Sequence, residues 1–277
     1  MKKIFLLSVI LLCLKAEIPK HSNELISVSI APQAFLVQEI TKNDSVNVIL
    51  PANLNEHNFE LKPNSMQKLE KSDIYFTIGL EFEKIFVDKF SQNFKKLTII
   101  NSQENIALLE DKEHGHTHFD PHTWLDPVLL KTMSLNIFKA LSVKYPLNKA
   151  FYEQNLNKLL TKLDELNSKL SSLSKLKNKN FLVYHPSWSY FAKRYKLVQI
   201  PVEIEGKEPK AKDLQRLIKL IKEENIKTIF VQKNFPENAV QTLAKECNLE
   251  IQTINHLAYD FENELLKIAF TLEKDNE

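Results

Sequence analysis

One long helical stretch without a break constrains the fold of this chain more than any other feature. Residues 146–176 contain no glycine and no proline after Pro146. Leucines recur at alternating spacings of three and four residues, at 156, 159, 163, 166, 170 and 173, as expected for a helix with one apolar face. A coiled-coil dimer would show the same stripe. We favour a helix packed on the protein's own lobes, because the stripe lasts under three heptads and lies between two halves that both have α/β patterns.

Short β-rich runs alternate with helical patterns on both sides of that stretch, which predicts parallel β-α-β units. The strand candidates are residues 25–30, 46–50, 74–78 and 97–100, then 181–184, 197–200, 228–232 and 249–254. Helical patterns cover residues 33–40, 65–71, 211–224 and 237–247, and another helix follows the loop at 120–128 and continues to about Val143. We therefore expect an α/β protein with two parallel-sheet lobes joined by one long rigid helix. The boundaries are 24–145 for the first lobe, 146–177 for the bridging helix and 178–277 for the second lobe.

The N-terminus has the composition of an export signal. Lys2 and Lys3 precede an apolar run at residues 4–14, and Ala16 supplies the small residue before a cleavage site, so residues 1–16 are predicted to be a signal peptide. The run is too short to cross a bilayer as a helix, and no other segment approaches that length; the competing interpretation is a buried N-terminal helix. Cys13 follows Leu12, where a lipoprotein signal needs a small residue, so lipid attachment is not expected.

Composition excludes several functional classes. Cleavage after Ala16 removes three lysines and no acidic residue, so the formal charge falls from +2 to −1, and no basic excess remains to indicate nucleic acid as a partner. Three glycines in the whole chain are too few for Gly-rich phosphate-binding loops. Only Cys247 would remain after cleavage, so any metal site must use histidines and carboxylates.

Three histidines stand where a ligand could bind. His57 comes shortly after the strand candidate that ends near Pro51, and His185 directly follows the strand candidate at 181–184. Ligands bind beyond the carboxyl ends of strands in open α/β sheets. His122 lies in the proline-bracketed loop DPHTWLDP. Three imidazoles and one carboxylate would suit Zn²⁺, although the wide spacing of the three histidines matches no local metal-binding motif.

Six segments give the chain a resemblance to a known family. They are NEHNFELKPNSMQKLE (55–70), SDIYFTIGLEFE (72–83), DPHTWLDP (120–127), YHPSWSYF (184–191), EIEGKEPKA (203–211) and IFVQKNFPENAVQTLA (229–244). In this order they resemble the metal-binding solute receptors of ABC importers, in the zinc/manganese cluster. The resemblance implies two α/β lobes bridged by a long helix, with a metal site in the cleft between them.

The resemblance also implies a ligand set. It assigns His57, His122 and His185 to the metal by direct motif match, and Glu56 as a further ligand in zinc-binding members. Many members carry an Asp near the C-terminus as the fourth ligand, but here Asn255 stands at that position and His256 follows. The fourth ligand is therefore open among Glu56, water, Asn255 and His256. Since imidazole favours zinc and oxygen favours manganese, the missing Asp points to Zn²⁺.

Other residues near these segments receive weaker assignments. Asp120 and Asp126 are expected either to orient the histidine loop or to cap a turn beside proline, and Trp124 and Trp188 to pack in the core. The short tract with His114, His116 and His118 would be a secondary collecting site or a solvated loop. Three acidic residues, Glu203, Glu205 and Glu208, are expected on a surface loop that could contact the importer.

The predicted function is an exported, periplasmic receptor, monomeric and not membrane-spanning, that carries Zn²⁺ to the membrane permease of an ABC importer. The same role with manganese or iron as cargo is the first alternative. A metal-dependent hydrolase with Glu56 as general base is a second, but the sequence offers no further acid, oxyanion-hole motif or nucleophile elbow. A surface adhesin or structural protein is a third, and no anchor, repeat or apolar patch supports it.

Overall fold

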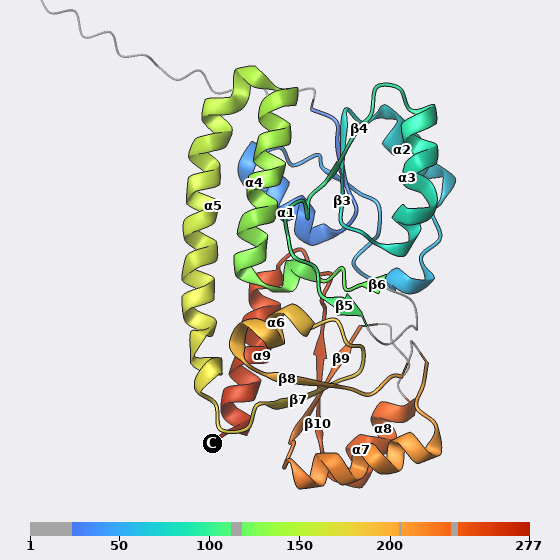
Figure 1. Ribbon diagram of the computed structural model, residues 1–277, viewed down its shortest axis with the longest axis vertical. Helices are drawn as coiled ribbons and strands as arrows, with labels where there is room; N and C mark the ends of the chain where they lie inside the picture. The colour runs from blue at the N-terminus through green and yellow to red at the C-terminus, as the bar shows by residue number, and fades with distance from the viewer. Residues whose placement is uncertain (1–23, 112–117, 205–206, 234–237) are drawn as a thin grey trace, which may run out of the picture.

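The computed structural model describes residues 24–111, 118–204, 207–233 and 238–277. It shows two lobes stacked along the long axis of the molecule (Figure 1). The predicted signal peptide, His114, His116 and Glu205 lie outside the described residues. Only the backbone of His118 is described, so the structure leaves the interpretation of the histidine tract untested.

The first lobe is built on a four-stranded parallel sheet in the order β2-β1-β3-β4. The chain forms β1 (Ile26–Val28), α1 (Ala31–Thr41), β2 (Asn47–Val48), η1 (Glu56–Asn58), α2 (Pro63–Lys71), β3 (Ile74–Thr77), α3 (Glu81–Asn93) and β4 (Thr98–Asn101). Helices α2 and α3 cover one side of the sheet, and α1 lies on the other (Figure 1). After β1 the chain forms β2 at one edge of the sheet and then returns to form β3 on the opposite side of β1. The strand order therefore reverses between β1 and β3.

The second lobe repeats this plan with a parallel sheet in the order β10-β9-β7-β8. Its elements are β7 (Asn180–Val183), α6 (Ser189–Tyr195), β8 (Val198–Pro201), α7 (Ala211–Glu223), β9 (Thr228–Gln232), α8 (Asn238–Cys247), β10 (Glu250–Ile254) and α9 (Phe261–Asp275). Here the strand order reverses between β7 and β9. Two parallel-sheet lobes were predicted from the sequence, and the structure confirms them.

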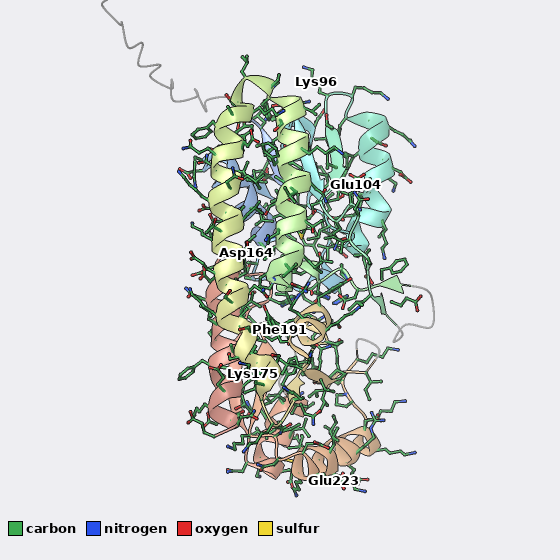
Figure 2. The ribbon with its side chains drawn as sticks, turned by 60° about the vertical axis from the view of Figure 1, so that its left-hand side comes forward. Lys96, Glu104, Asp164, Lys175, Phe191 and Glu223 are labelled. Atoms are coloured by element: carbon green, nitrogen blue, oxygen red, sulfur yellow. The ribbon has the colours of Figure 1, made fainter. Side chains whose placement is uncertain are left out.

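The segment between the lobes is helical almost throughout. A small antiparallel pair, β5 (Glu110–Asp111) and β6 (His118–Phe119), leads to η2 (Thr123–Leu125), α4 (Pro127–Lys144), η3 (Pro146–Asn148), α5 (Lys149–Leu170) and η4 (Ser171–Lys175). Helix α5 runs beside α4 along the first lobe and continues past α9 of the second lobe (Figure 1). Figure 2 shows Asp164 partway along α5, with Lys175 beyond the end of this helix, beside the second lobe.

The leucine stripe of the bridging segment is buried within the chain itself. Its members are at most 3% exposed and belong to a core cluster that contains side chains from both lobes. Burying a leucine side chain contributes roughly 1.5–3 kcal/mol to stability. The stripe therefore supplies a large part of the free energy that holds the helix against the lobes. This arrangement is the one favoured above over a coiled-coil dimer.

Two helix starts follow from local chemistry. Asp126 caps α4, because its side chain accepts a hydrogen bond from Val128 N at 2.8 Å while Pro127 occupies the first turn. At the start of α3 the buried carboxylate of Glu83 accepts hydrogen bonds from the backbone N–H groups of Ile78, Gly79 and Leu80. Burial raises the pKa of Glu83 to about 7 even though these donors act in the opposite direction. Within the described part of the chain, no helix combines the length and the apolar character needed to cross a membrane.

Candidate metal centre

Five candidate ligands from four separate segments meet between the two lobes. Glu56 and His57 lie in η1, in the loop that follows β2 of the first lobe. His122 directly precedes η2. His185 follows β7 and His256 follows β10, so both stand beyond the carboxyl ends of strands in the second lobe. All four residues predicted as ligands are therefore brought together, and His256 joins them.

The ring nitrogens of the four histidines converge on one carboxylate oxygen. Glu56 Oε1 lies 2.7 Å from Nε2 of His256, 3.3 Å from Nε2 of His122, 3.8 Å from Nε2 of His185 and 4.0 Å from Nε2 of His57. The Nε2 atoms of His57 and His185 are 3.1 Å apart. Imidazole and carboxylate donors gathered this closely have the composition of a zinc site.

The ligand atoms form two overlapping groups of three that share Glu56. One group is Glu56 with His122 and His256, and the other is Glu56 with His57 and His185; in each, the three ligand atoms lie within 4.8 Å of one another. The first group is buried throughout, whereas the second includes the one exposed ligand. The side chain of His57 is 35% exposed, against 6% or less for the other four. The cluster thus has an inner group and an outer group.

The structure distinguishes between Asn255 and His256. The Asn255 side chain is used in a turn, because its Oδ1 accepts a hydrogen bond from Leu257 N at 3.1 Å. The next side chain, His256, is the one that enters the cluster. Of the protein residues left open as a fourth ligand, Glu56 and His256 therefore reach the centre, and the Asn255 side chain is engaged elsewhere.

Buried carboxylates orient two of the histidines. Nδ1 of His122 is 2.7 Å from Asp120 Oδ1, and Nδ1 of His185 is 2.5 Å from Glu203 Oε1. A ring that donates its Nδ1–H to a carboxylate presents the lone pair of Nε2 to a metal. Asp120 Oδ1 also accepts a hydrogen bond from His122 N at 2.8 Å, so Asp120 contacts both the ring and the turn, as the two interpretations from the sequence expected.

The expectation that Glu203 lies on a surface loop is wrong, since this residue is only 5% exposed. The chain continues beside β7 after β8 ends, because the backbone N–H of Glu203 bonds to Tyr184 O at 3.1 Å. This extra pairing turns the Glu203 side chain toward His185. Glu208, from the same predicted loop, is exposed as expected.

Contacts between the lobes hold the backbone next to the ligands. The indole N–H of Trp124 donates to the backbone carbonyl of His256 at 2.7 Å, and the Tyr190 hydroxyl donates to the carbonyl of Asp120 at 2.8 Å. Asp126 forms a two-pronged ion pair with Arg194 of α6, with nitrogen–oxygen distances of 2.8–3.0 Å. Asp126 therefore caps a helix and joins the lobes.

Within the second lobe, a side-chain amide holds the backbone of His185 in place. The side-chain amide of Gln232, at the end of β9, accepts from His185 N at 3.1 Å and donates to His185 O at 2.6 Å. His185 thus lies where the strand order reverses between β7 and β9, a usual ligand-binding position in such sheets.

Trp124 and Trp188 are fully buried, as predicted.

The cluster has an uneven charge distribution in the absence of metal. Burial favours a neutral Glu56, but His256, His122 and His185 hold the pKa of its carboxyl well below the usual range. Burial would also keep His122 neutral, yet Asp120 and Glu56 raise its pKa to about 9. Partial burial and the neighbouring His185 lower the pKa of His57 to about 4, and full burial lowers the pKa of His256. The proton of the cluster is therefore favoured on His122, which lies between the Asp120 and Glu56 carboxylates.

The fold and the cluster together define a class of protein. Two parallel-sheet lobes, bridged by a long helix and enclosing an imidazole-rich centre, form a metal-binding solute receptor. The family profile described as "ZnuA: Zinc-uptake complex component A periplasmic" matches residues 26–265, and the chain belongs to this family. Its members are metal-binding receptors of ABC importers and not enzymes, which removes the hydrolase alternative.

Individual relatives agree with this assignment. The chain is 27% identical over 239 residues to the high-affinity zinc uptake system protein ZnuA of Bacillus subtilis (strain 168), covering 80% of this chain and 75% of that protein. A crystal structure of ZnuA superposes with a TM-score of 0.86 at 35% identity, covering 91% of this chain and 98% of that one. A ZnuA deletion mutant with zinc bound gives a TM-score of 0.84 at 35% identity, covering 91% and 97%.

Proposed function

We propose that this protein is a high-affinity Zn²⁺ receptor that works in the periplasm and delivers the ion to the membrane permease of an ABC importer. The observation that carries the proposal is the convergence of four imidazole Nε2 atoms on the Glu56 carboxylate. Membership of the zinc-uptake family and the zinc-bound structural neighbour support it.

In this proposal His57, His122, His185 and Glu56 bind the ion. Asp120 and Glu203 fix two of the rings so that Nε2 faces the metal. A set with several imidazoles and a single carboxylate favours zinc, whereas manganese prefers oxygen donors. Manganese or iron as cargo is therefore the less favoured alternative.

Export and assembly are further parts of the proposal. The basic start and short apolar run of residues 1–16 support cleavage and export, and the receptor is proposed to act as a monomer. The boundaries 24–145, 146–177 and 178–277 are proposed for the lobes and the helix between them. Cell fractionation of the full chain tests export: retention in the cytoplasm with residues 1–16 intact would contradict it.

The binding proposal is tested by titrating the metal-free protein from Glu17 onward with Zn²⁺ and, separately, with Mn²⁺. We expect tight binding of one zinc ion, much weaker manganese binding, and loss of zinc affinity in His122→Ala and His185→Ala. Lys245→Ala, on an exposed turn of α8, is the matched control and should bind as the unaltered protein does. Tighter binding of manganese than of zinc, or full zinc affinity in both histidine variants, would overturn the proposal.

A further inference from the structure

His256 belongs to the second lobe and is held by two contacts from the first lobe. It follows β10 of the second lobe and is 3% exposed. Its backbone carbonyl accepts the indole N–H of Trp124 from the first lobe at 2.7 Å. Its side-chain Nε2 lies 2.7 Å from Glu56 Oε1, again in the first lobe. A buried histidine held through its backbone carbonyl and through its Nε2 has a defined position toward the cluster.

The four rings lie around the Glu56 carboxylate, each with its Nε2 within 4.0 Å of Oε1. Ring centroids are 4.7 Å apart for His57 and His185, 5.6 Å for His122 and His185, 5.9 Å for His122 and His256, and 6.2 Å for His185 and His256. Their planes are inclined to one another by 50–68°, so the rings do not stack. Inclined imidazoles whose Nε2 atoms point inward can share one ion.

We infer that His256 is itself a ligand of the zinc ion, so that the cluster holds one donor more than a tetrahedral zinc site uses. The inference rests on the proposed function and adds a specific consequence to it. His57 is the exposed member of the set, and its departure would leave His122, His185, His256 and Glu56. Four donors would then still hold the ion while one side of it is open to solvent.

The simplest competing role for His256 is to donate a hydrogen bond that orients Glu56. Glutamine separates the two roles, because its side-chain N–H₂ can donate to Glu56 but glutamine does not replace an imidazole as a zinc ligand.

Asn255→Asp is the second diagnostic change. Since Asn255 Oδ1 faces Leu257 N, an aspartate there should keep the turn and leave both zinc and manganese affinity within about 3-fold of the starting values.

A double-mutant cycle with His57→Ala and His256→Gln tests the inference by competition for Zn²⁺ against a chromophoric chelator. If His256 is a ligand, each single variant keeps four donors and the double variant keeps three. The combined loss of affinity should then exceed the product of the two single losses by about 10-fold or more, which is a coupling of neighbouring sites. If His256 only orients Glu56, His256→Gln alone should be neutral and the double variant should equal His57→Ala.

X-ray absorption of the zinc-loaded His57→Ala protein gives a second readout that keeps His256 intact. Three coordinated imidazoles support the inference, and two overturn it. Because His57 is the exposed ligand, this variant leaves the buried residues of the cluster unchanged. If the unaltered protein takes up zinc tightly, but the variants show no coupling and His57→Ala has two coordinated imidazoles, only the role of His256 fails. If the unaltered protein takes up no zinc, the proposed function fails with it.

Discussion

The carboxylate of Glu203 offers the sharpest test of how the centre is oriented. Its Oε1 lies 2.5 Å from Nδ1 of His185, and both side chains are about 6% exposed. Glu203→Gln keeps the size of the side chain and an acceptor oxygen but removes the charge. The amide can also turn its N–H₂ toward Nδ1, and the ring would then present a protonated Nε2 to the metal.

Loss of such a carboxylate partner behind a metal-binding histidine lowers affinity by about 10- to 100-fold, or about 1.4–2.8 kcal/mol. We expect Glu203→Gln to fall in this range for Zn²⁺ in a chelator competition at constant pH. Glu208→Gln removes an exposed carboxylate from the same loop and serves as the control. Equal zinc affinity in Glu203→Gln and Glu208→Gln, with both proteins folded, would refute the orienting role.

Further predictions concern helix capping, core packing and the protonation of the centre. Asp126→Ala removes the cap of α4 and the ion pair with Arg194, so denaturant unfolding should show a loss of about 2–4 kcal/mol; an unchanged midpoint would contradict this. Leu163→Ala leaves a cavity under α5 and should cost about 2–5 kcal/mol in the same assay, which an exposed change such as Lys158→Ala should not. The pKa of His122 is raised to about 9, so its protonation stabilises the metal-free fold. This stabilisation is fully present below the ordinary histidine pKa of about 6.5 and is lost as pH rises through about 9. Zinc binding at neutral pH should release about one proton. Calorimetry in buffers of different ionisation enthalpy measures this release. Zinc binding without proton release would count against a protonated His122.

The alternation of strands and helices could be predicted because each buried strand is a short apolar run between turn residues. The sequence interpretation assigned no helix to α3, α6 or α9. In α3, aromatic residues at Phe82, Phe86 and Phe90 do recur with helical spacing, and Phe86 and Phe90 stack at 5.9 Å. The adjacent Ile85 and Val87 are β-branched and weaken the helical signal, so tertiary packing decides the outcome there.

The candidate ligands were predictable to different degrees for a physical reason. His57, His122 and His185 stand in distinctive segments, and two of them follow strands, where topology places ligands. The choice between Asn255 and His256 depends on which side chain caps a turn and which points inward. That choice is set by the hydrogen bond from Leu257 N to Asn255 Oδ1, which the order of two polar residues does not reveal. Glu203 was misplaced because its burial depends on pairing beyond the end of β8.

The positions of the contacts between the lobes indicate which part of the centre can move. Trp124, Asp120 and Asp126, which flank His122, all bond to the second lobe, and α5 packs on both lobes. Opening the lobes would therefore break the bonds that position His122 and His256 before it released the ion. Glu56 and His57 instead lie in a turn where the backbone N–H of His57 bonds to Asn55 Oδ1 within the same turn. Turning the partly exposed His57 side chain outward breaks fewer contacts than separating the lobes, so we expect release to begin at His57 while the inner group of Glu56, His122 and His256 comes apart last.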